Sequence, residues 1–182
     1  VSVNCSSNKG PNLHPDASKK TLGSMPDWYL NLPVNEGYKY VTATSTSRDM
    51  QVAVDKATLA ASNKLAGQIK SDMNAVIDRV QKETGLGKDS DVIDVFTQTQ
   101  EQIISTSLED WKVSNKAIEV EKTDAGRIYR AYVMVEWDEG AAQKQLLAKI
   151  KGDKQLFDAM EASELLDNME EKVQRYRERN QN

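Results

Sequence analysis

The feature that most constrains the fold of this chain is a run of apolar residues at helical spacing between Asp49 and about Thr84. One apolar residue every three or four positions is the pattern of an α-helix with one buried face. Its members are Met50, Val54, Ala57, Ala61, Leu65, Ile69, Met73, Val76 and Val80. At about 36 residues and ~1.5 Å per residue, this helix is longer than a small sheet can cover. We therefore expect it to bend or to extend beyond the core, and Gly85-Leu86-Gly87 predicts its end.

Three segments have the composition or alternation of β-strands. Tyr38–Ser45 is rich in Tyr, Thr and Val, with Val41 and Ala43 on one side, and Ser47 after it is a predicted helix N-cap. The runs 116–122 and 128–137 alternate on either side of the turn 123–126, which predicts a hairpin. The expected inner face of its second strand is Tyr129, Ala131, Val133, Val135 and Trp137. The opposite face is expected to be half exposed, with Arg130, Tyr132, Met134 and Glu136.

The remaining segments have helical spacing. A second helix is expected from Asp89 or Ser90 to about Leu108, and helices follow Trp137 to the end of the chain, with a break at Gly152-Asp153. From Ala162 the apolar steps of 4, 3, 4 and 3 form a short heptad pattern. The predicted fold class is α+β, with a small antiparallel or mixed sheet of about three to four strands, a long helix packed on it, and C-terminal helices.

Composition supports three parts within this chain of 182 residues. Residues 1–25 are polar and non-periodic, which predicts a flexible N-terminal tether. Residues 26–137 are expected to form the α+β domain, with elaborated helices over 49–108, and residues 138–182 a C-terminal helical extension. An apolar fraction of 38% with 29% charged residues is consistent with a polar tether and with helices that expose one side to solvent.

The rare residues exclude several classes of function. The single cysteine, Cys5, excludes an internal disulfide, and with the single histidine, His14, it excludes the common zinc motifs. Mixed charges with a net charge of −4 argue against nucleic-acid binding, and no apolar run reaches the length of a membrane span. Neither an enzyme nor a cofactor is expected.

Two patterns resemble catalytic or ligand sites and have simpler interpretations. Glu136, Asp138 and Glu139 are interpreted as a solvated strand end rather than an acid–base pair. Gly85-Leu86-Gly87-Lys88 follows a helix and precedes Asp89, so it is interpreted as a helix C-cap rather than a phosphate loop.

Cys5 has three interpretations: an incidental thiol, a redox handle or an acylation site. The polar run 6–10 that follows it is typical of the tether of a mature bacterial lipoprotein, although Ser2 and Asn4 depart from the usual lipobox.

A further pattern joins the aromatic segment to the first strand and helix. Pro26-Asp27-Trp28-Tyr29 precedes Pro33, the strand 38–45, the sequence 47–51 and spaced alanines at 53, 57 and 60. Over residues 25–137 this order resembles the LPP-twenty family of small bacterial outer-membrane lipoproteins, which has FlgP-like flagellar members. The resemblance implies a periplasm-facing domain anchored to the outer membrane by a lipid on Cys5. It also implies assembly into rings or discs around the flagellar motor.

The expected function is therefore that of a structural, self-assembling envelope lipoprotein. We expect it to form a homo-oligomer and to contact other flagellar motor proteins. The residues predicted to make oligomer or domain-docking contacts are Trp28, Tyr29, Leu30, Leu166, Met169, Val173 and Tyr176. The alternative is a monomeric periplasmic binding or assembly-chaperone lipoprotein, unconnected with flagella, that binds its partner through Arg130, Tyr132 and Met134.

Overall fold

The computed structural model describes residues 25–123, 126–161 and 163–180. Cys5, His14 and the predicted tether up to residue 24 lie outside these residues. In chain order the elements are α2 (Asp27–Leu30), β1 (Tyr38–Ser47), α3 (Met50–Thr84), α4 (Asp91–Ser107), the 3-10 helix η1 (Leu108–Asp110), β2 (Lys112–Thr123), β3 (Gly126–Asp138), α5 (Glu139–Gly152), α6 (Lys154–Met160) and α7 (Glu164–Arg179).

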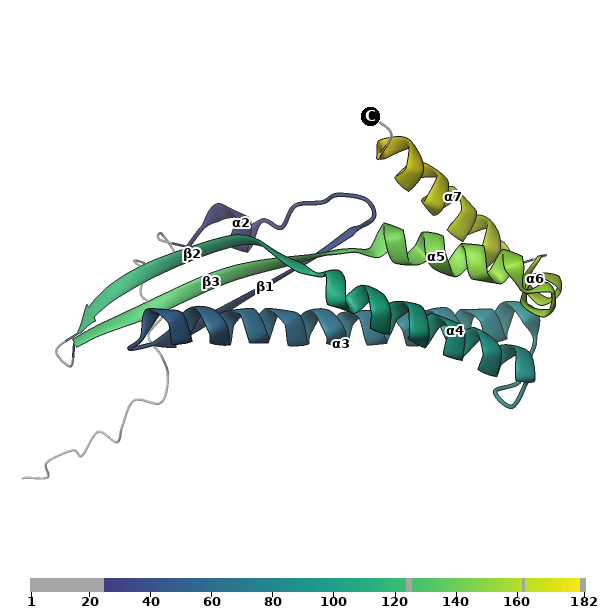
Figure 1. The fold of residues 1–182 in the computed structure, drawn as a ribbon, viewed down its shortest axis with the longest axis horizontal. Coiled ribbons are helices and arrows are strands. Elements are labelled where there is room, and N and C mark those ends of the chain that lie inside the picture. The colour runs from purple at the N-terminus through teal and green to yellow at the C-terminus, as the bar shows by residue number, and fades with distance from the viewer. Residues whose placement is uncertain (1–24, 124–125, 162, 181–182) are drawn as a thin grey trace, which may run out of the picture.

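The three strands form one antiparallel sheet in the order β1-β3-β2. The central strand β3 pairs with β1 from Tyr38↔Asp138 to Ser47↔Tyr129. Helix α3 runs along one face of the sheet, and helices α4 to α7 gather at one end (Figure 1). The predicted α+β class, with a long helix on a small sheet and helices at the C-terminal end, is confirmed.

The first half of α3 lies close to the sheet because its inner positions are alanines. Ala53, Ala57 and Ala61 are fully buried, within the same core cluster as Val41 of β1 and Val133 of β3. The N-cap is Asp49, whose Oδ1 accepts from the Val52 N–H at 2.9 Å, so the prediction of Ser47 as the cap is wrong. The Ser47 hydroxyl instead accepts from the Asp49 N–H.

Both ends of α3 differ from its middle. Met50, placed in the buried stripe from its spacing, is exposed because it lies in the first turn. Gly85 ends the helix with a φ of +70°, and its N–H donates to the carbonyl of Gln81. This left-handed conformation is accessible to glycine at little cost, as the sequence predicts.

The second half of α3 extends past the sheet and is covered by the other helices. Leu65, Ile69 and Val80 are buried in the same cluster as Phe96 of α4 and Ile150 of α5. One core thus runs from the sheet into the C-terminal helices. It continues across residue 138, where the sequence predicted the C-terminal extension to begin. None of the helices in the described residues is long and apolar enough to cross a membrane.

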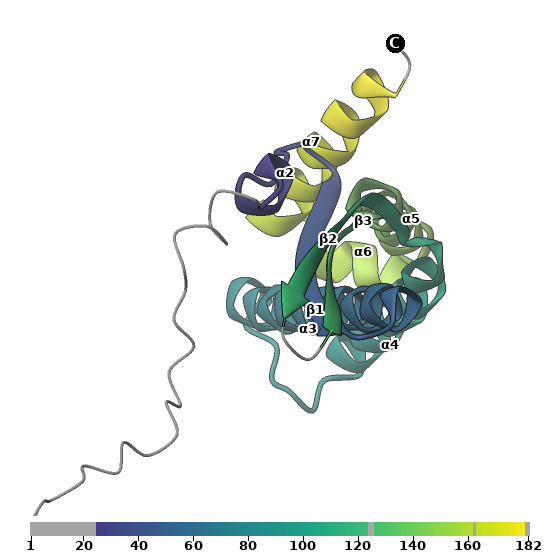
Figure 2. The ribbon, with the colours of Figure 1, turned by 90° about the vertical axis from the view of Figure 1, so that its left-hand side faces the viewer.

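The second face of the sheet is also covered. Tyr132 is 1% exposed and Met134 is 2% exposed, so the prediction that this face is half exposed is wrong for both. Tyr132 is covered by α2, which lies on the opposite side of the sheet from α3 (Figure 2). The Tyr29 ring meets the Tyr132 ring edge to face, with centroids 5.0 Å apart.

Candidate functional site

An apolar cavity lies between the helices at the end of the molecule away from the start of β3. Helices α3, α4, α5 and α7 line it, together with Trp137 at the end of β3. Its volume is about 130 Å³. Its walls are largely apolar and include Ile69, Met73, Val76, Ile103, Leu146 and Met169. We call this cavity the helical pocket.

Gln100 of α4 is the exception among these apolar walls. It is 5% exposed, and its Oε1 atom is buried without a hydrogen-bond partner among the described residues. A buried acceptor in that state costs about 1–3 kcal/mol relative to one that is paired. Gln100 lies four residues after Phe96 and three before Ile103, so it occupies a core position of the helix. That spacing is the sequence signal that Gln100 is buried. The signal is hard to recognise because Gln100 lies within a polar run.

Charged and polar groups lie around the helical pocket's opening. Asp72, Arg79, Asn168 and Lys172 line it and are exposed. Lys39 of β1 forms an ion pair with Asp72 of α3 at the same opening. This combination of apolar walls, one buried amide and a polar rim is typical of a small-molecule site between helices.

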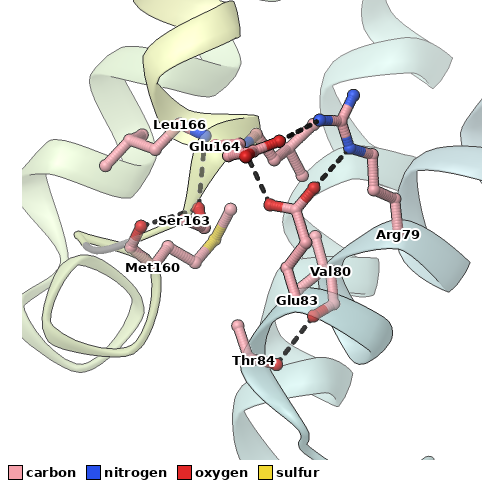
Figure 3. A network of polar contacts seen from close by, with 9 residues as sticks. Arg79, Val80, Glu83, Thr84, Met160, Ser163, Glu164 and Leu166 are labelled. Atoms are coloured by element: carbon pink, nitrogen blue, oxygen red, sulfur yellow. Dashed lines mark hydrogen bonds and ion pairs between the residues drawn. The ribbon is translucent and has the colours of Figure 1, made fainter.

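One side of the pocket is held by a polar junction between the end of α3 and the start of α7 (Figure 3). Glu83 binds the Arg79 guanidinium with one carboxylate oxygen and accepts the Leu165 N–H with the other, at 2.9 Å. The Arg79 hydrogen bond, reinforced by the Leu165 N–H, lowers the pKa of Glu83. Glu83 therefore caps α7 from a different helix, while Ser163 accepts the Leu166 N–H as the local cap.

A second junction fixes the other end of α7. The Tyr176 hydroxyl donates to Asp138 at 2.7 Å, and Asp138 also caps α5 by accepting the Ala141 N–H. The Tyr176 ring lies against the backbone of Gly37 and Gly140, where an added Cβ on Gly140 would be 2.2 Å from a ring carbon. Burial, followed by the hydrogen bond to Asp138, raises the pKa of Tyr176 to about 12. Asp138 therefore has a structural environment, not that of a solvated strand end.

The other residues with a catalytic interpretation also have structural partners. Glu136 forms an ion pair with Lys112, and Glu139 accepts from Gln143 at 3.0 Å. Lys88, from the pattern that resembles a phosphate loop, lies in the exposed segment after α3. Among the described residues, no group of three or more His, Cys, Asp and Glu side chains is arranged to hold a metal ion.

The predicted contact residues lie inside the chain in most cases. Leu166, Met169 and Val173 are buried in the core cluster, and Met169 lines the helical pocket. Trp28 and Tyr29 are half buried, with their rings 6.3 Å apart, while Leu30 is exposed. The aromatic segment and the heptad, which the sequence predicted to make oligomer or domain-docking contacts, are thus mainly used for packing within one chain.

An apolar row remains exposed on β2, which sequence reasoning did not single out. Val113, Ile118 and Val120 are 42%, 36% and 54% exposed. They pair with Val135, Ala131 and Tyr129 of β3, so they lie on the sheet face that carries α3. Helix α3 packs under β1 and β3, however, and β2 is lifted away from it (Figure 1). We call these three residues the β2 row.

Comparison with known proteins gives no assignment, because no family model, no curated protein and no solved structure matches this chain.

Proposed function

We propose that this chain is a structural protein that self-associates through strand β2. The observation that carries the proposal is the exposed β2 row, on an edge strand whose outer edge no other element of the described residues pairs with. Exposed apolar side chains and an open strand edge are both features of interaction surfaces.

The two edge strands, β1 and β2, differ in one side-chain contact. On β1, the Lys64 side chain reaches across to the carbonyl of Thr42 at 3.3 Å. On β2, which is 12 residues long, no backbone hydrogen bond to any element besides β3 occurs within the part of the chain that the structure describes. The outer edge of β2 is therefore available for pairing with another strand.

A second copy of the same strand fits this edge. Opposite residues in an antiparallel pair share a face, so a two-fold axis at Ile118 puts this residue against its own copy. The same register sets Lys116 against Val120 and Ala117 against Glu119. No like charges then face each other directly, and the two sheets join into one.

Sedimentation velocity of the full chain at about 10 μM tests this proposal. We expect a dimer or larger assembly for the natural sequence and a monomer for Ile118→Arg, which would set two cations against each other. Val120→Arg is a second disrupting variant, and circular dichroism checks that each variant is folded. Leu59→Arg is the matched control, since Leu59 is an exposed apolar residue on α3.

Two results would overturn the β2 interface. One is a monomer for the natural sequence at this concentration. The other is loss of the assembly in Leu59→Arg with none in the two β2 variants, which would place the contact on α3.

The location is proposed from the sequence resemblance alone. On that basis, the protein is held at the periplasmic face of the outer membrane by a lipid on Cys5 and contributes to a disc or ring of the flagellar motor. Metabolic labelling with a radioactive fatty acid tests the anchor, and equal labelling of the natural protein and Cys5→Ala would exclude it.

The predicted alternative, a monomeric binding module acting through Arg130, Tyr132 and Met134, loses most of its surface because Tyr132 and Met134 are buried. A binding role has better support at the helical pocket.

A further inference from the structure

We propose that the helical pocket binds a small apolar alcohol or phenol whose hydroxyl group donates a hydrogen bond to Gln100 Oε1. This site is separate from the β2 row and does not depend on self-association. The proposal rests on the size of the pocket, its apolar walls and the single unpaired acceptor within it.

The volume sets the size of the ligand. A cavity of about 130 Å³ is close to the apolar cavities of ~150 Å³ that take up a benzene molecule. A six-membered ring or a branched aliphatic group of similar size therefore fits, whereas a nucleotide or a long acyl chain does not fit within it.

The walls determine the polarity of the ligand. Met73 and Val76 come from α3, Ile103 from α4, Leu146 from α5 and Met169 from α7, so apolar side chains face the cavity from four helices. Methionine side chains adapt to ligands of different shapes and make favourable contacts with aromatic rings.

Gln100 adds the polar requirement. Its Oε1 is an acceptor, so the missing partner is an O–H or N–H donor. The indole N–H of Trp137 cannot supply it, because this group donates to the Ser107 carbonyl at 2.9 Å. Gln143 is likewise engaged with Glu139.

Water alone is a poorer occupant than an amphipathic ligand. A buried water needs two to four polar partners. The described lining offers one unpaired buried acceptor, while its remaining polar side chains are paired or exposed at the opening. A ring with one hydroxyl group satisfies Gln100 and fills the apolar space with a single molecule.

Phenol is the probe and benzene is the matched control, because they differ only in the hydroxyl group. In titration calorimetry with the full chain we expect phenol to bind with a Kd of about 0.1–1 mM. We expect benzene to bind about tenfold more weakly, because it leaves the acceptor unpaired.

Methionine methyl NMR locates the binding. Phenol should shift the methyl signals of Met73 and Met169, which line the helical pocket, and leave those of Met50 and Met160 in place. Movement of Met50 or Met160 instead of the lining methionines would overturn the assigned site.

Two variants test the role of Gln100. Gln100→Leu keeps the side chain's approximate volume and removes the acceptor, so it should bind phenol and benzene equally. Val76→Phe fills the cavity and should bind neither. Equal affinity of the natural protein for both probes, a preference for phenol retained in Gln100→Leu, or no binding of phenol at about 10 mM would each contradict the proposal.

Discussion

Tyr176, near the end of the last helix, donates a hydrogen bond of 2.7 Å to Asp138, which ends the central strand. These residues are 38 positions apart, and the same carboxylate caps α5. The contact therefore ties β3, α5 and α7 together at one point. A salt bridge from Arg175 to Glu36 holds α7 beside the start of β1 at the same place.

Removing the Tyr176 hydroxyl should weaken this junction. We expect Tyr176→Phe to lower the free energy of unfolding by about 1 kcal/mol, because Asp138 loses a partner while the ring remains. Urea denaturation measures the change. An unchanged midpoint would show that the bond adds nothing to stability.

The same variant should change the alkaline limit of stability. The folded-state pKa of Tyr176 is raised from 10.0 to about 12, so its contribution to stability is complete below pH 10 and is lost as the pH rises toward 12. The natural protein should therefore lose more stability over this range than Tyr176→Phe does. Absorbance of the phenolate, compared between the two proteins, reports the titration directly.

Gly140 should tolerate no larger side chain. In Gly140→Ala the new methyl group would be 2.2 Å from the Tyr176 ring, so the ring must move and we expect a loss of about 1–3 kcal/mol. Gly67→Ala is the matched control, because Gly67 lies inside α3 with open space around it. This control should gain about 0.5–1 kcal/mol from helix propensity. Similar melting temperatures for the two variants would contradict the tight contact.

Glu83 should make the α3–α7 junction sensitive to acid. Its pKa is lowered in the folded state, so its stabilisation is present above the ordinary value of 4.5 and is lost as the pH falls through the lowered value. Glu83→Gln should be less stable than the natural protein at pH 7, by no more than about 1 kcal/mol, because solvent screens the group. The difference should vanish at low pH, and thermal melts across the acid range measure it.

Docking of α2 should control the burial of Tyr132. Burial, then the nearby Glu119 carboxylate, raises the pKa of Tyr132. Tyr29→Ala uncovers this ring, so we expect its pKa to fall toward 10.0 and the unfolding free energy to drop by about 1–2 kcal/mol. Leu30→Ala is the control, since Leu30 is exposed. Faster hydrogen exchange in β3 for Leu30→Ala than for Tyr29→Ala would contradict the role of Tyr29.

The sequence by itself determined the long helix, the hairpin and the α+β class. Spacing of three or four identified α3, and alternation identified the two strands of the hairpin, because burial on one face leaves a periodic trace along the chain. Gly85 marked the end of α3, since a helix terminus has local conformational requirements. The spacing of Gln100 within its helix also indicates a core position, but it does not show that its side-chain oxygen is left unpaired in a cavity.

Only the tertiary structure decided which apolar faces meet inside one chain. The aromatic segment and the C-terminal heptad were predicted to make oligomer or domain-docking contacts, and each packs largely on its own chain. Spacing shows that a face is buried but not what buries it, because the partner comes from a distant segment. For the same reason the helical pocket, the Tyr176–Asp138 bond and the uncovered β2 row became visible only once the helices were placed on the sheet.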